Sequence, residues 1–139
     1  MVATEVTTDA TGVVGTVVGV VQEAAFGPLV VFSLGGVATD VLGDRAARLA
    51  PLTDADADAM IGEVRAAPLL LGRAGSPAVD TAVLTGLLLR VSRLADDLPE
   101  VAELDLNPVI ARADGVYPVD VRVRVVPVAP RDPFLRQLR

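Results

Sequence analysis

The sequence ELDLNP at residues 103–108 places acidic and amide side chains in strict alternation with apolar ones. A β-strand sends successive side chains to opposite faces of its sheet. The pattern therefore predicts a strand with Asp105 and Asn107 on a polar face and with Leu104 and Leu106 on an apolar face. The polar face is the strongest candidate for a functional site in this chain.

The residues that follow this strand predict a β-hairpin. Asp114-Gly115 is a two-residue turn signal, and with that turn Asn107 faces Arg122 on the second strand. The residues of the second strand that then land on the apolar face are Val119, Val121, Val123 and Val125. Asp120 lands on the polar face as the diagonal neighbour of Asn107, roughly 7–8 Å away along the backbone.

Two interpretations of this polar face stay open on the pattern alone. A hard cation such as Mg²⁺ typically takes one or two protein carboxylates or carbonyls and completes its octahedron with phosphate oxygens and water. Asn107 and Asp120 can hold one such cation between them. A polar outer face is also common on half-exposed hairpins that bind nothing.

The composition excludes several classes of function. At 139 residues the chain has the length of one domain, and its 52% hydrophobic content is enough for a buried core. The net charge of −6 comes without a basic tract, and only 3% of the residues are aromatic. Nucleic-acid binding depends on Lys or Arg contacts to phosphate and on aromatic stacking, so no nucleic-acid partner is expected.

Three chemically important residue types are absent. The chain has no Cys, no His and no Lys, since all 12 of its basic residues are Arg. It therefore cannot supply a thiolate, an imidazole base, a phosphohistidine or a Schiff-base lysine. Any catalysis within it depends on carboxylates, Arg, hydroxyls or a bound metal.

No segment predicts an export signal or a membrane span. The N-terminal region carries Glu5 and Asp9 rather than a basic region. The longest apolar run, at residues 13–21, is about half the roughly 18–20 residues that a membrane helix needs, and its β-branched residues favour a buried strand. No membrane partner is expected, and the cytoplasm is the expected compartment.

The remaining pattern predicts an α+β fold. Thr53 begins one helix, and Ser76-Pro77 caps a second one. Three other segments predict strands, at residues 16–21, 29–32 and 44–52. The expected architecture is a mainly antiparallel sheet with two helices packed on one face.

Three further features carry possible chemistry. Gly35-Gly36 follows a buried strand, where backbone N–H groups can approach a phosphate, although a glycine pair is also a common tight turn. Arg48 suits a phosphate or carboxylate partner, or is a plain surface arginine. The acids Asp54, Asp56 and Asp58 spread over different faces of the first helix, so we interpret them as capping and solvated residues.

Five motifs occur together along the chain. They are Gly19-Val20, residues 26–32 with Gly35-Gly36, Asp44 with residues 48–52, residues 70–75, and residues 103–108. In this order they resemble the ATP-grasp region of NDP-forming acyl-CoA synthetases, which are relatives of the β-subunit of succinyl-CoA synthetase. The same region is found in bacterial proteins that join a ligase-like part to a GNAT acetyltransferase domain. The resemblance covers about residues 13–126, with a lead-in segment at 1–12 and a tail at 127–139.

This resemblance implies a function and a site. Members of the family bind Mg²⁺ with ATP or ADP between two α+β lobes, and they transfer phosphoryl between the nucleotide, a phosphohistidine and an acyl phosphate that becomes an acyl-CoA such as acetyl-CoA. By resemblance, the magnesium ligands are Asp105, Asn107 and Asp120, and the nucleotide-binding residues are Gly35, Gly36 and Arg48. The expected partners are the nucleotide, the other ATP-grasp lobe and a CoA-binding domain.

The chain also departs from the family pattern. Gly15 stands where the family usually has a Glu, Ser33 replaces the first Gly of Phe-Gly-x-Gly-Gly, and Ala74 replaces an Arg. Because the family's lysine and phosphohistidine are absent, no catalytic residue is assigned, and the 139 residues alone are expected to be inactive. The alternative is a degenerate, non-catalytic or regulatory module of a multidomain acetyltransferase. A half-domain exposes an apolar cleft face, which also suits a homo-oligomer.

Overall fold

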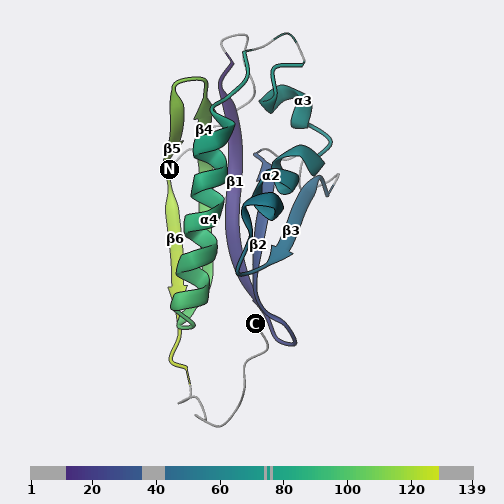
Figure 1. The fold of residues 1–139 in the computed structure, drawn as a ribbon. Helices are drawn as coiled ribbons and strands as arrows, with labels where there is room; N and C mark the ends of the chain where they lie inside the picture. The colour runs from purple at the N-terminus through teal and green to yellow at the C-terminus, as the bar shows by residue number, and fades with distance from the viewer. Residues whose placement is uncertain (1–11, 36–42, 74, 76, 129–139) are drawn as a thin grey trace.

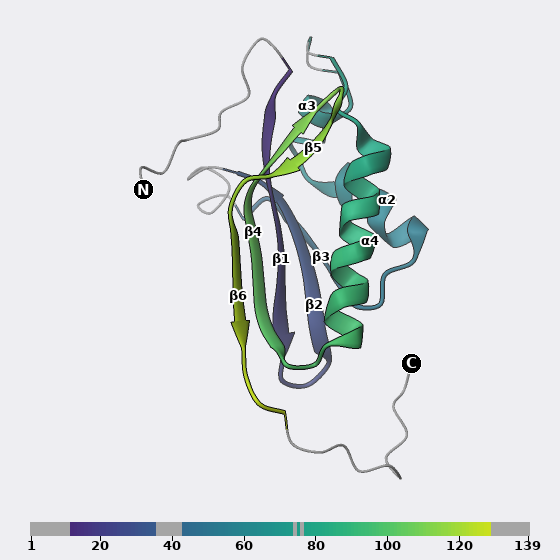
Figure 2. The same cartoon turned by 90° about the vertical axis from the view of Figure 1, so that its left-hand side faces the viewer.

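The computed structural model describes residues 12–35, 43–73, 75 and 77–128. Its antiparallel sheet has the strand order β3-β2-β1-β4-β5, and β6 also pairs with β4. The helices α2 and α4 cover one face of the sheet (Figures 1 and 2). The predicted α+β fold is therefore confirmed. In chain order the elements are β1 (Val14–Glu23), β2 (Gly27–Leu34), β3 (Arg45–Leu49), α2 (Asp54–Glu63), α3 (Ala67–Leu70), α4 (Thr81–Asp97), β4 (Val101–Arg112), β5 (Gly115–Pro118) and β6 (Val121–Val125).

Strand alternation places the core between the sheet and the helices. Val18 of β1 and Phe32 of β2 are fully buried on the helix side of the sheet. Leu84 and Leu88 belong to the apolar stripe of α4 and are also fully buried. Burying one such side chain stabilises the fold by roughly 1.5–3 kcal/mol. This single apolar layer holds the helices against the sheet.

Thr53 caps α2, as the sequence predicts. Its hydroxyl accepts a hydrogen bond from the Asp56 N–H (3.1 Å), and the Asp56 carboxylate accepts one from the Thr53 N–H (2.9 Å), which completes a capping box. These hydrogen bonds, the one from the Thr53 backbone first, hold the pKa of Asp56 below its usual range. Asp58 accepts a hydrogen bond from the Thr85 hydroxyl (2.9 Å), which links α2 to α4. Asp56 thus has the capping role expected of the acids of α2, and Asp58 connects the two helices.

The second predicted helix begins later than the sequence indicates. α4 starts at Thr81 with Asp80 as its N-cap, whereas the predicted cap at Ser76 lies outside the described residues. The N–H of Val79 donates to the Leu70 carbonyl oxygen (2.9 Å), so the chain just before α4 bonds across the fold as a non-helical connection. The short helix α3 was not predicted. No helix in the described ranges has both the length and the apolar character needed to cross a bilayer.

The predicted hairpin forms, but its register differs from the prediction by two residues. The turn is Ala113-Asp114, so Gly115 is the first residue of β5 rather than part of the turn. Further along, Arg122 faces Asp105 instead of Asn107. Because the shift is an even number of residues, the side chains of β4 up to Asn107 keep their predicted face.

The environment of Gly115 suits a glycine at the first position of β5. Its φ of 153° lies in the range that favours glycine. A Cβ at this position would lie 2.9 Å from the hydroxyl oxygen of Tyr117. The glycine is therefore required where the strand begins and the Tyr117 side chain passes. An Asp-Gly pair signals a nearby turn, but it does not fix which residues form it.

A β-bulge interrupts β4 at the end of the ELDLNP sequence. Thr16 pairs with Val109 and Val18 pairs with Leu106, so two residues of β4, Asn107 and Pro108, lie against a single residue of β1. The bulge reverses the alternation of β4. The even-numbered Leu106 is buried before the bulge, and the odd-numbered Val109 is buried after it.

The edge strand β6 is more exposed than its pattern suggests. Val121 and Val123 pair with Leu106 and Leu104 and share their face, as predicted. Both valines are nevertheless about half exposed, at 52% and 51%. They lie at the border of the sheet, whereas α4 packs mainly over β1 and β2. The alternation predicted the face of these side chains but not their burial.

Candidate functional site

Asp105 and Asn107 lie on the open face of the sheet, which is the side opposite α2 and α4. Asp105 is half-buried, and Asn107 is exposed at the bulge. The leucines that precede them, Leu104 and Leu106, are buried. The alternation in the sequence therefore has the structural consequence that it predicts. Both polar side chains face away from the core.

Asp120 lies between β5 and β6, directly opposite Asn107. The Asn107 N–H donates to the Asp120 carbonyl oxygen (3.1 Å), and the Val119 N–H donates to the Pro108 carbonyl oxygen (3.0 Å). With the two-residue register shift, a backbone hydrogen bond makes Asn107 and Asp120 neighbours across the strands, in place of the predicted diagonal placement.

Gly19 leaves space beside Asp105. The two residues are cross-strand partners in β1 and β4. A Cβ at Gly19 would lie 3.3 Å from the Leu104 carbonyl oxygen, which is tighter than an ordinary contact. Because position 19 has no side chain, the flank of Asp105 that faces β1 is uncovered.

The donor chemistry of Asp105, Asn107 and Asp120 fits a hard divalent cation. Two carboxylates and one amide supply only oxygen ligands, which Mg²⁺ prefers. Within the described ranges, no three or more His, Cys, Asp or Glu side chains gather to hold a metal. The candidate set therefore depends on the Asn107 amide. The remaining coordination positions of an octahedral Mg²⁺ would be filled by phosphate oxygens and water.

The predicted phosphate-binding glycines are only partly described. The N–H of Gly35 donates to the Gly15 carbonyl oxygen (2.8 Å), so this amide is already bound within the fold. Gly36 lies outside the described residues. Gly15 itself pairs with Ile110 of β4 and brings no side chain to the site. Residues 15 and 35 thus form a backbone contact between the ends of β1 and β2.

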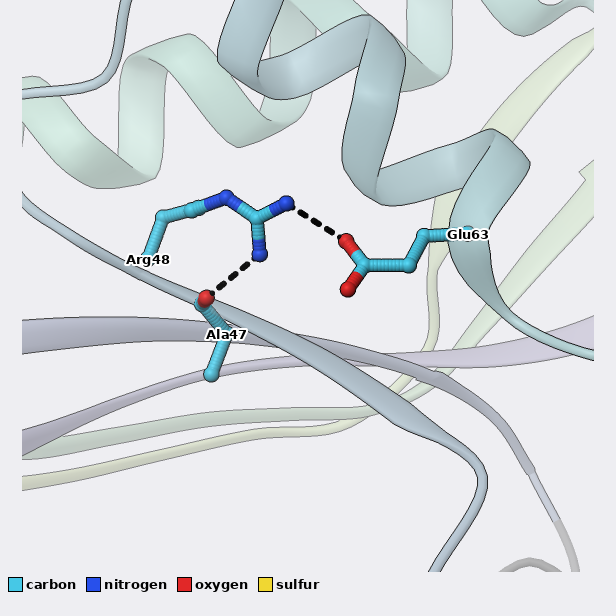
Figure 3. Close-up of polar contacts among 3 residues, drawn as sticks. All are labelled: Ala47, Arg48 and Glu63. Atoms are coloured by element: carbon cyan, nitrogen blue, oxygen red, sulfur yellow. Dashed lines mark hydrogen bonds and ion pairs between the residues drawn. The ribbon is translucent and has the colours of Figure 1, made fainter.

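Arg48 points to the helix side of the sheet. Its Nη2 lies 2.6 Å from Oε2 of Glu63 on α2, and its Nη1 donates to the Ala47 carbonyl oxygen (2.8 Å), as Figure 3 shows. Arg48 pairs across strands with Val30, which is fully buried on the helix side. The structure therefore does not bring Arg48 together with Asp105. Its contact with a nucleotide stays a prediction.

Sequence reasoning missed two polar anchors beside this region. The Asp44 carboxylate accepts hydrogen bonds from the N–H groups of Arg65 and Ala66 (2.6 and 3.1 Å) and so fixes the chain after α2. The buried hydroxyl of Ser92 accepts one from the Leu52 N–H (2.7 Å). Ser92 was detectable, because a polar residue within the apolar stripe of a helix needs a buried partner.

A cavity of about 360 Å³ lies between α4 and β5. Its lining includes Val83 and Arg90 of α4 and Val116 of β5, and it contains none of the predicted site residues. It opens on the helix side of the sheet, away from Asp105. We therefore assign the candidate site to the open face and not to this cavity.

The sequence of this chain is similar to a known protein family and to two acetate–CoA ligases. The ATP-grasp domain family matches residues 2–125. The chain is 40% identical over 107 residues to the β subunit of the ADP-forming acetate–CoA ligase I of Pyrococcus furiosus. It is 43% identical over 107 residues to the ADP-forming acetate–CoA ligase I of Archaeoglobus fulgidus. Each match covers 77% of this chain but only 46% and 16% of these two relatives, so the chain spans less than half their length.

A solved structure shows the same similarity in three dimensions. It is the dinucleotide-forming acetyl-coenzyme A synthetase 1 of Ca. Korarchaeum cryptofilum, in complex with coenzyme A and Mg-AMPPCP. The TM-score is 0.78 at 41% sequence identity, and the match covers 81% of this chain and 53% of that chain. That structure has its phosphohistidine segment pointing towards the nucleotide-binding site.

Proposed function

Given that this chain belongs to the ATP-grasp domain family of ADP-forming acyl-CoA synthetases, we propose that it holds Mg²⁺ on the phosphates of ATP or ADP in such an enzyme. The observation that carries this proposal is the hydrogen bond from the Asn107 N–H to the Asp120 carbonyl oxygen, which makes these two residues neighbours near Asp105. The Korarchaeum relative, which binds Mg-AMPPCP and coenzyme A, supports the choice of ligand.

The role of this chain in the reaction is electrostatic and positional. Bound Mg²⁺ neutralises charge on the phosphates and aligns them for phosphoryl transfer. Asp105 and Asn107 project from β4, a strand paired on both sides, and a rigid strand holds ligands more exactly in place than a loop does. Because the chain has neither His nor Lys, it supplies no proton-transfer imidazole and no ammonium contact to phosphate.

These 139 residues do not supply the whole enzyme, since they contain no His and no Lys. The partners that we propose are the other ATP-grasp lobe and a CoA-binding domain that carries the phosphohistidine. The P. furiosus relative is itself a β subunit, which supports assembly from more than one part. We propose that the isolated chain has no acyl-CoA synthetase activity, since it lacks the residue that carries the phosphoryl group.

A second candidate function is a non-catalytic ATP-grasp module. Three observations favour it: position 15 lacks a side chain, the Gly35 N–H is bound to the Gly15 carbonyl, and Arg48 is paired with Glu63. The relatives named above are CoA ligases, so nothing in them supports an acetyltransferase fusion. The two candidates differ in one measurable property, which is whether metal binds at Asp105, Asn107 and Asp120.

Paramagnetic broadening by Mn²⁺ in NMR spectra of the 139-residue chain tests this directly. We expect Mn²⁺, a stand-in for Mg²⁺, to broaden the amide signals of Asn107 and Asp120 first. Asp120→Asn should weaken Mn²⁺ binding at least tenfold, the effect of losing one charged ligand contact. The backbone hydrogen bond to residue 120 remains in this variant, so its fold should be retained.

Glu103→Gln is the matched control. Glu103 lies on the same strand and face but pairs with Arg124 instead of the candidate ligands, so Mn²⁺ binding should stay within about twofold of the native chain. The proposal is wrong if Mn²⁺ broadens amide signals elsewhere first, or if the native chain and Asp120→Asn bind Mn²⁺ with equal affinity. Normal binding of Mn²⁺ without any binding of Mg-ADP, even when the other ATP-grasp lobe is supplied, would favour the non-catalytic module.

A further inference from the structure

Three cross-strand pairs form a polar row on the open face. Glu103 pairs with Arg124 and Asp105 pairs with Arg122 in the register of β4 and β6. The third pair is Asn107 with Asp120, described above. Arg122 therefore lies between a structural ion pair and the candidate magnesium ligands, and it faces one of those ligands directly.

The two arginines of β6 differ in their contacts. Nη2 of Arg124 lies 3.4 Å from Oε1 of Glu103. Arg122 forms no ion pair within 4.0 Å among the described residues, although Asp105 is its cross-strand partner. Both arginines are exposed on the same face, two positions apart. Arg122 thus has its guanidinium available for a ligand, whereas Arg124 already has a partner.

A guanidinium at this position suits a phosphate group. Its planar fork donates two parallel hydrogen bonds to phosphate oxygens, and it stays charged at any physiological pH. A nucleotide held by a cation at Asp105, Asn107 and Asp120 has its phosphates on the open face, within reach of the adjacent strand. Arg124 is one pair further from Asp120 along the row and has its charge balanced by Glu103.

We propose that Arg122 is a phosphate-binding residue of this nucleotide site, with its guanidinium on the phosphate oxygens of the Mg-bound nucleotide. The inference rests on the proposed function of Asp105, Asn107 and Asp120. It adds a protein cation to a site in a chain that contains no Lys. It also makes β6, and not only the ligand-bearing strand β4, part of the binding surface.

This role predicts opposite effects of one substitution on two ligands. Arg122 repels a bare metal ion nearby, but it attracts the phosphates of a metal-bound nucleotide. Arg122→Gln should therefore weaken Mg-ADP binding about tenfold, the loss expected for one charge-assisted contact. Binding of Mn²⁺ alone should be unchanged or up to about twofold tighter, because salt and water screen the repulsion.

The experiment is a pair of NMR titrations of the 139-residue chain, one with Mn²⁺ and one with Mg-ADP. The native chain, Arg122→Gln and the matched control Arg124→Gln are compared, and circular dichroism checks that each is folded. In the native chain the Arg122 Nε–H signal should shift on adding Mg-ADP but not on adding Mg²⁺ alone. Arg124→Gln should bind both ligands within about twofold of the native chain.

Failure of this inference is distinguishable from failure of the proposed function. If Asp120→Asn loses both ligands while Arg122→Gln binds Mg-ADP normally, only the role of Arg122 is wrong. Equal weakening of Mn²⁺ and Mg-ADP in Arg122→Gln would show a structural role and overturn the inference. If the native chain binds neither ligand, both proposals fall together.

Discussion

The two halves of the sheet use their polar residues differently. In the half formed by β1, β2 and β3, the candidate groups are engaged within the protein, since the Gly35 N–H binds the Gly15 carbonyl and Arg48 pairs with Glu63. In the half formed by β4 and β6, Asp105 and Arg122 face each other across strands without an ion pair among the described residues. Polar groups that the fold does not use are the ones available to a ligand.

The largest difference between the halves should appear in stability. We expect Ser92→Ala to lower the free energy of unfolding by about 1–3 kcal/mol, because the part-buried Leu52 N–H loses its acceptor. Chemical denaturation measures this value. Asp120→Asn in the other half should change it by less than about 0.5 kcal/mol, as for a typical surface substitution. Ser92 lies on α4, which packs over β1 and β2, so a Ser92→Ala protein as stable as the native chain would show that the helix layer over this half does not depend on its internal polar contact.

A smaller effect is expected at the exposed ion pair of Arg48. Arg48→Gln and its partner variant Glu63→Gln should each cost at most about 1 kcal/mol in denaturation, because half-exposed ion pairs contribute little. Mn²⁺ broadening at Asn107 should not change, since Arg48 points to the opposite side of the sheet. Weaker Mn²⁺ binding in Arg48→Gln would instead show that the two halves are coupled.

The same variant also tests the nucleotide role that resemblance assigns to Arg48. If Arg48 contacts the nucleotide despite its bond to Glu63, Arg48→Gln weakens Mg-ADP binding and Glu63→Gln does not. Unchanged Mg-ADP affinity in both variants leaves Arg48 with its structural ion pair alone. Either result sharpens the contrast between the two halves.

The smallest effect concerns the cap of α2 and its dependence on pH. The pKa of Asp56 is lowered in the folded chain, so its carboxylate stabilises the fold above the ordinary value of 3.8. That contribution is lost as the pH falls through the lowered pKa. The native chain should therefore melt at a higher temperature than Asp56→Asn at pH 7, and this difference should shrink below pH 3.8. A difference that is the same at both pH values would contradict this account of the cap.

The sequence predicts the faces of the strands well because alternation has a period of two. Asp105 and Asn107 were placed on the polar face correctly, and a register error of two residues did not alter that. The register itself was not predictable from Asp114-Gly115, since a glycine serves equally in a turn or at the first position of a strand. In the structure Gly115 is the first residue of β5, where its φ of 153° favours glycine.

Long-range contacts decided the remaining differences. Ser76 and Asp80 are both good N-cap residues, and α4 starts at the second because the Val79 N–H is bound to the Leu70 carbonyl. Arg48 of β3 forms an ion pair with Glu63 of α2, and no local sequence pattern predicts this contact. The exposure of Val121 likewise follows from its place at the border of the sheet.

The bulge at Asn107 and Pro108 divides β4 into two segments of opposite phase. The extra residue at this point is what lets Leu106 on one side of the bulge and Val109 and Ala111 on the other all face the core. Deleting one residue here would remove the bulge and leave these three side chains inward in one continuous alternation. A deletion elsewhere in β4 would instead exchange the inside and the outside of the residues on one side of it.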